Sequence, residues 1–391
     1  MNDKKFETKA IRIQAERSGY KEHSVPIFES SSFIFDSAEE AEAVFSDLKK
    51  GYVYSRLSNP NNDELVNKLC ALEGTESGIA TSSGMAAIFL GMAGVLQAGD
   101  HLIASRHLFG TTHLLIEQIL PKWGISHSYV NMNNQEEVAA NLLPVTKMIY
   151  VESPSNPGLE IFDLKWLGNF SIKNDLFFVI DNSFATPLLQ NPVKFGADFI
   201  IHSTTKFIDG QGRTLGGAIL GQERFIKDIA SISGIVGTIM SPATACILSR
   251  SLETLSVRMQ RHCSNALKLA EFLENHEEIL WVKYPFLKTH PGYKLAKKQM
   301  KSGGGLVTFE LKGGRDRALQ FINALKLFSI TSNLGDSRTS ITHPSTTTHS
   351  KLLPEEKIRT GITEGMIRVS VGLEHIDDII EDVANAIEHT K

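Results

Sequence analysis

The sequence predicts an α/β fold with a mostly parallel central sheet, helices on both faces, an N-terminal arm and a smaller C-terminal α+β domain. From about Leu65 onward, short apolar runs alternate with helical stretches, which indicates βαβ units. The run Phe177-Phe178-Val179-Ile180 is continuously apolar, as in a strand that is buried on both faces. Polar residues directly follow several of these runs, and open α/β sheets bind ligands at the carboxyl ends of their strands. The pattern therefore predicts a binding site at that edge.

Residues 1–62 are predicted to form an arm rather than a compact unit. The segments 23–35 and 51–62 are rich in Ser, Pro, Asn and aromatic residues, and the regular pattern begins only after them. An arm of this composition usually packs against another surface, and a second subunit is one candidate for that surface.

Residues 63–255 are predicted to form the α/β domain. Its strands are expected at 78–81, 101–104, 127–130, 148–152, 177–181, 199–202 and 217–220. Short polar sequences follow three of these strands and begin at Glu152, Asp181 and His202. The carboxyl edge of the sheet is therefore the expected place of the site.

Residues 256–391 are predicted to form the C-terminal α+β domain, after one long helical stretch at 242–275. Strands are expected near 306–310 and 367–371, and the glycines 303–305 are expected to turn into the first of them, because no phosphate-loop pattern surrounds them. The last helix carries its apolar residues on one face, which predicts a helix packed on a core. These residues are Ile376, Ile379, Ile380, Val383 and Ile387.

Composition and charge exclude several classes of protein. A chain of 391 residues, 42% hydrophobic and 21% charged, predicts a folded protein of two or three domains. The net charge is −4, and the densest basic run, 294–301, is predicted to be a solvated helix face, so no nucleic-acid or membrane partner is expected. Three distant cysteines without CxxC spacing argue against disulfides and structural zinc. Neither a signal peptide nor a membrane span is evident, so a cytoplasmic protein is expected.

Three short sequences carry candidate chemistry. In Thr81-Ser82-Ser83-Gly84-Met85-Ala86-Ala87, a strand end passes through small residues into a helix, where free N–H groups favour an anion. Small residues at such a turn also occur for purely structural reasons. Asp181 ends a buried strand, where a carboxylate needs a cation or several donors. A protonated pyridine nitrogen is such a cation; the alternative is a carboxylate that caps the next turn.

The third sequence is His202-Ser203-Thr204-Thr205-Lys206-Phe207. Lys206 follows a buried strand and is surrounded by hydroxyl groups that can bind phosphate. A lysine beside a buried pocket can form an imine if its neutral state is accessible. A lysine after a strand is more commonly a solvated side chain, so its context decides.

The segment from Ser203 to Gln211 is similar to the cofactor-lysine signature of the cystathionine γ-synthase family, pyridoxal-phosphate (PLP) enzymes of cysteine and methionine metabolism with fold type I. Three further blocks resemble family blocks and occur in the same order: 54–60 (Tyr-Ser-Arg-Leu-Ser-Asn-Pro), 152–157 and 367–374. The resemblance extends from about residue 20 to the C-terminus.

This resemblance implies a set of site residues and no metal. Lys206 is expected to hold PLP as a Schiff base and to move protons, with Asp181 and Tyr54 as further catalytic residues. Arg368 and Asn333 are expected to bind the substrate, and Arg368 to take its carboxylate. The expected cofactor-binding residues are Lys206, Asp181, Ser203, Thr205, Ser83, Gly84, Met85, Phe109, Asn156, Tyr54 and Arg56. Because Tyr54 and Arg56 are expected to serve a neighbour's cofactor, the family pattern implies a homo-oligomer, a tetramer built from dimers.

Departures from the family pattern narrow the expected activity. Many members carry Tyr-Gly-x-Thr over the cofactor, and methionine γ-lyases tend to have Cys two positions after that Tyr; this chain has Phe109 and Thr111. It also has Asn333 where many relatives have Ser. These features look most like O-succinylhomoserine sulfhydrylases, which implies γ-replacement on an O-acylhomoserine by sulfide to give homocysteine for methionine biosynthesis.

Other activities remain as alternatives. O-acetylhomoserine sulfhydrylases, cystathionine γ-synthases and methionine γ-lyases share the same site residues. A catalytically idle scaffold on this fold is a further alternative, against which the joint presence of Lys206, Asp181 and Arg368 argues. A nicotinamide-dependent oxidoreductase is disfavoured, because no GxGxxG follows an early strand.

Overall fold

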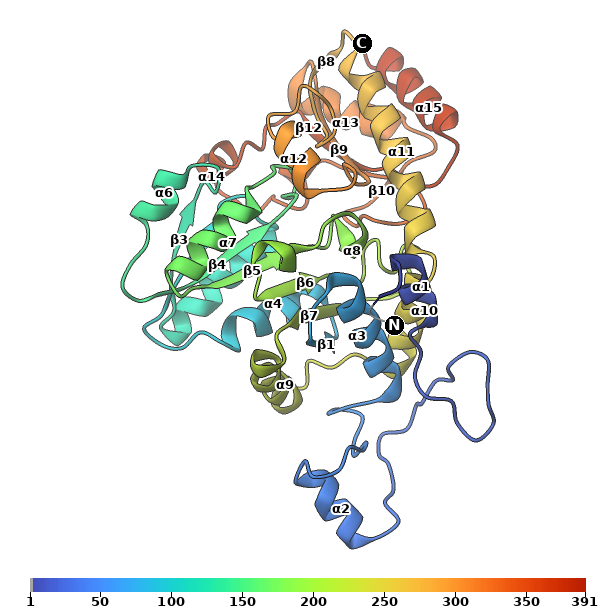
Figure 1. The fold of residues 1–391 in the computed structure, drawn as a ribbon. Helices are drawn as coiled ribbons and strands as arrows, with labels where there is room; N and C mark the ends of the chain where they lie inside the picture. Colours follow the sequence, from blue (N-terminus) through green and yellow to red (C-terminus); the bar gives the residue numbers. More distant parts are fainter. Residues whose placement is uncertain (1–2) are drawn as a thin grey trace.

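The computed structural model describes residues 3–391 and is built around a seven-stranded sheet (Figure 1). The strand order is β1-β7-β6-β5-β4-β2-β3, in which β3, β2, β4, β5 and β6 run parallel and β7 pairs antiparallel with β6 and β1. The strands are β1 Ser77–Thr81, β2 His101–Ser105, β3 Ser126–Val130, β4 Thr146–Glu152, β5 Phe177–Asp181, β6 Phe199–His202 and β7 Gly217–Gly221. The predicted mostly parallel sheet is confirmed, and every predicted strand of this sheet is present within two residues of its expected bounds.

Helices cover both faces of this sheet, as predicted. Apolar side chains of α3, α7 and α10 pack against one face, and those of α4, η1 and α9 against the other. These and the neighbouring elements are α1 Phe6–Arg12, α2 Ala38–Phe45, α3 Pro60–Glu73, α4 Gly84–Ala93, α5 Gly110–Leu114, η1 Leu115–Ile119, η2 Leu120–Trp123, α6 Gln135–Ala140, α7 Leu164–Lys173, α8 Thr186–Leu189, η3 Pro192–Phe195, α9 Glu223–Val236 and α10 Pro242–Leu252. Burial on both sides explains why the middle of β5 is apolar without interruption.

A second, five-stranded sheet of order β10-β11-β12-β9-β8 forms the smaller C-terminal part. Its core includes one face of α15, although Ile380 lies at the edge of that face and is only partly buried. The elements are α11 Leu255–Glu274, β8 Ile279–Lys283, α12 Tyr293–Gln299, β9 Leu306–Leu311, α13 Gly314–Ala324, β10 Ser329–Ile330, β11 Ser340–Thr342, η4 Pro344–Thr346, α14 Pro354–Arg359, β12 Met366–Ser370 and α15 Ile376–His389. The lysines of α12 are exposed, as predicted for a solvated helix face.

The long helical stretch expected at 242–275 is present, and the structure divides it into two helices, α10 and α11. At the break, the Arg258 guanidinium donates to the carbonyl oxygens of Ser251 (2.9 Å) and Phe207 (2.6 Å). The end of α10 thereby gains a side-chain donor for a carbonyl that a continued helix would have bonded internally. The first half of α11 then packs into the core of the larger domain and its second half into the core of the smaller one. The boundary expected between residues 255 and 256 lies in its first turn.

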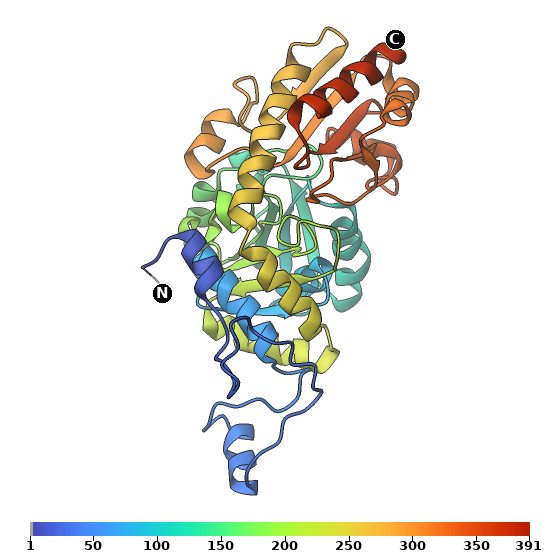
Figure 2. The ribbon, with the colours of Figure 1, turned by 90° about the vertical axis from the view of Figure 1, so that its right-hand side faces the viewer.

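The arm begins on the body of the protein and then leaves it. Helix α1 contacts α3 and α10, and residues 15, 25, 26 and 28 form hydrogen bonds with these two helices, whereas the loop between them and the segment that carries α2 project away from both domains (Figures 1 and 2). The projecting parts expose large apolar side chains, among them Tyr20 and Ile34, which are 96% and 95% exposed. Concentrated apolar exposure marks an interaction surface.

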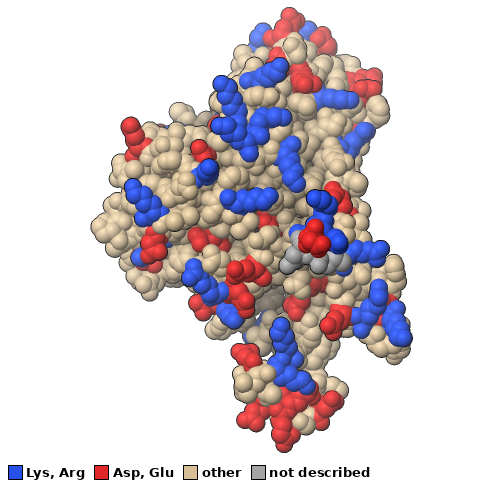
Figure 3. Space-filling view, viewed as in Figure 1, with Lys and Arg blue, Asp and Glu red and all other residues tan. Residues whose placement is uncertain are grey.

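Charges of both signs are interspersed over the body, and acidic side chains gather at the tip formed by α2 (Figure 3). Within residues 3–391, no helix is long and apolar enough to cross a membrane.

Candidate active site

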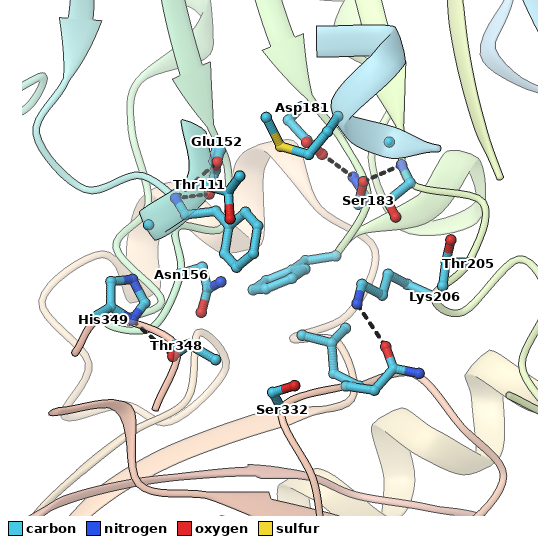
Figure 4. Close-up of a pocket in the computed structure, with 18 of the residues that line it drawn as sticks. Thr111, Glu152, Asn156, Asp181, Ser183, Thr205, Lys206, Ser332, Thr348 and His349 are labelled. Carbon is cyan, nitrogen blue, oxygen red and sulfur yellow. Dashed lines mark hydrogen bonds between the residues drawn. The ribbon is translucent and has the colours of Figure 1, made fainter. Parts of the chain in front are cut away.

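A cavity of about 730 Å³ lies where the carboxyl ends of β4, β5 and β6 meet segments of the smaller domain (Figure 4). Glu152, Asp181 and Ser203 reach it from these strand ends. Ser332 and Arg368 line it from the smaller domain. The cavity is therefore at the edge that the strand pattern predicts, and side chains of both domains form it.

Asp181 is held at the bottom of the cavity by a short chain of hydrogen bonds. The backbone N–H of Ser183 donates to Asp181 Oδ1 (2.9 Å), and the Ser183 hydroxyl oxygen accepts from the N–H of Ser203 (2.6 Å). Burial raises the pKa of the Asp181 carboxyl. Within the described chain, no Lys, Arg or His forms an ion pair with it. A carboxylate of this kind is stabilised by a cationic ligand that faces it from the cavity.

Lys206 lines the same cavity, and the pKa of its amine is lower than that of an ordinary lysine. Burial, reinforced by the charge of Arg368 and opposed by that of Asp181, lowers the pKa of Lys206 to about 8. Its Nζ donates to Asn333 Oδ1 at 2.6 Å (Figure 4). A neutral amine is the form that attacks a carbonyl carbon, so this environment suits imine formation.

Arg368 lies on the middle of β12, is only 2% exposed and still reaches the cavity. Its guanidinium donates to Asn156 Oδ1 (2.8 Å) and to the Ser332 carbonyl oxygen (3.2 Å). Burial lowers the pKa of Arg368 to about 10, which leaves it charged at neutral pH. Neither partner carries a charge, so the guanidinium can still pair with a ligand carboxylate.

The turn from β1 into α4 forms a close-fitting wall with β7 and the segment after β6. A Cβ atom on Gly84 would lie 2.7 Å from Ser203 Cβ, and one on Gly217 would lie 2.2 Å from the Ser83 carbonyl oxygen. Only glycine fits these two positions. Helix α4 begins beside Ser203, and its first backbone N–H groups, which include that of Met85, can donate hydrogen bonds to an anion.

Two of the expected cofactor-binding residues have other partners in the structure. The Ser83 side chain caps α4 by accepting from the N–H of Ala86 (3.1 Å). The Thr205 hydroxyl donates to the Gly216 carbonyl oxygen (3.1 Å) and accepts from the Gly216 N–H (3.0 Å). Ser203 and Thr205 both line the cavity, but a phosphate on Thr205 would compete with Gly216 for the hydroxyl proton.

Phe109 precedes α5 and lines the cavity, as expected for a ring that stacks on a cofactor. Its N–H donates to both carboxyl oxygens of Glu152, at 3.0 and 3.1 Å. Burial, and after it the neighbouring Asp181, raise the pKa of Glu152 well above its usual range. The role of Glu152 as an anchor for Phe109 was not indicated by the sequence, and its position in a polar sequence after a strand was the only available signal.

A buried network lies behind the cavity and joins the strand ends to α3. His202 Nε2 lies 2.7 Å from Glu73 Oε1, and the Asn182 amide donates to the same oxygen at 2.7 Å. All three side chains are at most 1% exposed. The network fixes the ends of β5 and β6, from which Asp181 and Ser203 reach the cavity.

Tyr54 and Arg56 are not brought to the cavity of their own chain. The Arg56 guanidinium donates to the Gly234 carbonyl oxygen and lies 5.6 Å from the centre of the Tyr54 ring. Tyr54 remains 42% exposed. Both residues therefore lie outside the cavity of their own chain, beside the end of α9.

The residues that line the cavity fit PLP. An accessible neutral amine at Lys206 suits its aldehyde, the wall at Gly84 and Ser203 suits its phosphate, and Asp181 suits a protonated ring nitrogen. No group of His, Cys, Asp and Glu residues suited to a metal ion occurs among the described residues.

Comparison with known proteins gives matches along nearly the whole chain. Residues 7–388 match the model of the Cys/Met metabolism PLP-dependent enzyme family. An L-methionine γ-lyase of Fusobacterium nucleatum is 41% identical over 384 residues, which cover 97% of each chain. An O-succinylhomoserine sulfhydrylase of Pseudomonas aeruginosa is 41% identical over 382 residues, which cover 98% of this chain and 95% of that protein.

A solved structure has the same fold over its whole length. It is described as an O-acetylhomoserine (thiol)-lyase of Campylobacter jejuni and contains a pyridoxyl-lysine phosphate. The TM-score is 0.94 and the identity 33%, with 98% of this chain and 100% of the other covered. PLP is thus the cofactor of this group of proteins, in agreement with the fit of the cavity.

Replacing Asp181 by Asn tests whether its charge serves the cofactor. The pKa of the Asp181 carboxyl is raised in the folded protein, so the folded state loses stability as the pH rises above about 4, the ordinary pKa of an aspartate. A neutral amide at this position does not ionise and so avoids that loss. Asn also keeps the acceptor for the Ser183 N–H. We therefore expect Asp181→Asn to leave the melting temperature of the apoenzyme unchanged or raised, and to weaken PLP binding about tenfold or more. Unchanged PLP affinity, measured by equilibrium titration, would identify Asp181 as a turn cap only.

Proposed function

The chain belongs to the Cys/Met metabolism PLP-dependent enzyme family, and from this we propose that it catalyses γ-replacement on an O-acyl-L-homoserine. The incoming nucleophile is sulfide, the leaving group is the acyl carboxylate, and the product is homocysteine. O-succinyl-L-homoserine is the favoured substrate. The reaction would supply homocysteine for methionine biosynthesis.

The observation that carries this proposal is that, among the described residues of this chain, no tyrosine lines the cavity with Lys206. Phe109 supplies a stacking face to the cavity and no acid. Lys206 is therefore the proton carrier of this wall, with its pKa lowered to about 8. A reaction that moves a proton between neighbouring carbons of one substrate needs no second acid there.

In this proposal, different side chains of the cavity bind the substrate and transfer its protons. Arg368 pairs with the α-carboxylate and fixes one end of the substrate. Bound PLP supplies the electron sink that makes the α- and β-protons acidic. Lys206 takes the α-proton, and its flexible side chain then reaches the neighbouring carbons. Asn333 accepts from Lys206 Nζ and holds the amine on the side of the smaller domain between transfers.

In the proposed reaction, one bond at Cγ is broken and one is formed. The Cγ–O bond breaks as a β-proton is lost, and the acyl group leaves as a carboxylate. Hydrosulfide then forms the Cγ–S bond, and protons return to Cβ and Cα. The net change replaces the acyloxy group by a thiol, with no oxidation or reduction.

Methionine γ-elimination is the second candidate. The observation in its favour is the 41% identity to a methionine γ-lyase, equal to that to the sulfhydrylase. Elimination leaves the γ-position without a nucleophile and ends in methanethiol, ammonia and 2-oxobutyrate. Relative rates on the two substrates therefore separate the proposals.

We further propose that the active unit is at least a dimer, built into a tetramer, with sites shared between subunits. Tyr54 and Arg56 lie outside the cavity of their own chain, on an arm that exposes apolar side chains. A neighbour's cofactor phosphate would give the Arg56 guanidinium a charged partner.

The substrate assay tests the proposed reaction. Purified holoenzyme should form homocysteine from O-succinylhomoserine and sulfide much faster than it forms 2-oxobutyrate from methionine. Phe109→Tyr keeps the stacking face and should stay active, whereas Phe109→Ala loses a contact of about 0.5–1.5 kcal/mol and should bind PLP more weakly. Faster methionine breakdown in the wild-type protein would replace the sulfhydrylase proposal with the lyase one.

Mixing two inactive variants tests the shared site. Lys206→Ala and Arg56→Ala proteins, denatured and refolded together, should regain about a quarter of the wild-type activity, because about half of random dimers are mixed and each holds one intact site. Each variant refolded alone serves as the control. Mixed dimers, verified by two affinity tags, that remain inactive would contradict the sharing of sites.

A further inference from the structure

We propose that Lys351 binds the distal carboxylate of the substrate's acyl group and so selects a dicarboxylic acyl chain, such as succinyl, over acetyl. This inference rests on the proposed function, since it concerns the acyl group of the same substrate. It assigns a specificity role to a residue that no sequence motif singled out.

The charged side chains that line the cavity lead to this assignment. They are Glu152, Asp181, Lys206, Lys351 and Arg368. The two acids lie at the ends of β4 and β5, Lys206 is required for the cofactor, and Arg368 faces the α-carboxylate. Lys351 is the one cationic residue of this set that the proposed reaction does not yet use. It makes no ion pair with another residue in the part of the chain that the structure describes.

The segment that carries Lys351 is held in place by its backbone. Within 347–352, the N–H of His349 donates to the Pro344 carbonyl oxygen (3.0 Å) and that of Leu352 to the His349 carbonyl oxygen (3.2 Å). The Leu352 side chain is buried in a small apolar cluster. Lys351 therefore extends from a fixed backbone at the rim of the cavity.

This segment also contacts the start of α5 closely. A Cβ atom on Gly110 would lie 2.6 Å from the Thr348 carbonyl oxygen. The glycine next to Phe109 thus allows the segment to approach the wall that stacks on the cofactor. Figure 4 shows Thr348 and His349 beside Thr111 and Asn156, on the cavity wall opposite Lys206.

The two assigned cations differ in depth, which matches a substrate with two carboxylates. Arg368 is almost fully buried, whereas Lys351 is exposed. A substrate whose α-carboxylate lies on Arg368 extends its acyl chain from the γ-oxygen away from the reacting carbons. The far end of a succinyl chain carries a carboxylate, which remains hydrated if it ends at the rim, and the Lys351 ammonium can pair with it there. An acetyl group ends in a methyl and gains nothing from that charge.

Kinetics with two substrates and a set of charge variants test the proposal. Lys351→Met removes the charge and keeps the length, Lys351→Arg keeps the charge, and Lys351→Glu reverses it. Lys122→Met, an exposed lysine outside the cavity, is the matched control. The kcat/KM for O-succinylhomoserine and for O-acetylhomoserine is measured for each holoenzyme with sulfide, at low and high salt.

Lys351→Met should lower kcat/KM for O-succinylhomoserine about tenfold and leave that for O-acetylhomoserine within about twofold. Lys351→Arg should restore most of the loss, and Lys351→Glu should deepen it. Salt should weaken the wild-type preference more than that of Lys351→Met, because the pair is exposed. Equal losses on both substrates, or no loss on either, would overturn the assignment while the wild-type reaction stands. A wild-type protein that uses neither acylhomoserine would instead refute the proposed function.

Discussion

Asp181 ends a strand that is buried on both faces, and its carboxylate faces the cavity without a direct ion pair to any Lys, Arg or His of the described chain. A charge in that position is costly, and a ligand that brings a positive group to it reduces the cost further than the hydrogen bonds of Ser183 and the charge of Lys206 do. The surrounding structure preserves this arrangement. Ser183 supports the carboxylate with an N–H, and the buried network at His202 fixes the strand ends. Binding of a protonated ring nitrogen is therefore coupled to the relief of an electrostatic cost.

The smaller domain contributes the second half of the site. Arg368 and Asn333 reach the cavity from segments far along the chain, and they contact Asn156 and Lys206 of the larger domain. These contacts cross the boundary between the two cores, so the relative position of the domains sets the distance between Arg368 and Lys206, which are proposed to bind the substrate carboxylate and to carry protons. Shifts of that distance are expected to change the rate strongly.

Much of this architecture could be predicted from the sequence. The bounds of β5 and β6 were predicted without error, because a buried parallel strand is apolar throughout and a polar sequence ends it. The break between α10 and α11 could not be predicted, because it depends on carbonyl groups of a distant loop that Arg258 binds. Likewise, the bond from Glu152 to the Phe109 N–H and the pairing of Arg368 with Asn156 join residues that only the tertiary fold brings together.

We propose that the sheet edge holds Lys206 as an easily deprotonated amine for PLP. The most direct test is to mix apoenzyme with PLP between about pH 6 and about pH 11.5, reduce with borohydride and map the labelled peptide. The rate of labelling should rise through an inflection at about 8, with the label on Lys206. An inflection near the ordinary lysine value of 10.5, or a label on another lysine, would contradict the account.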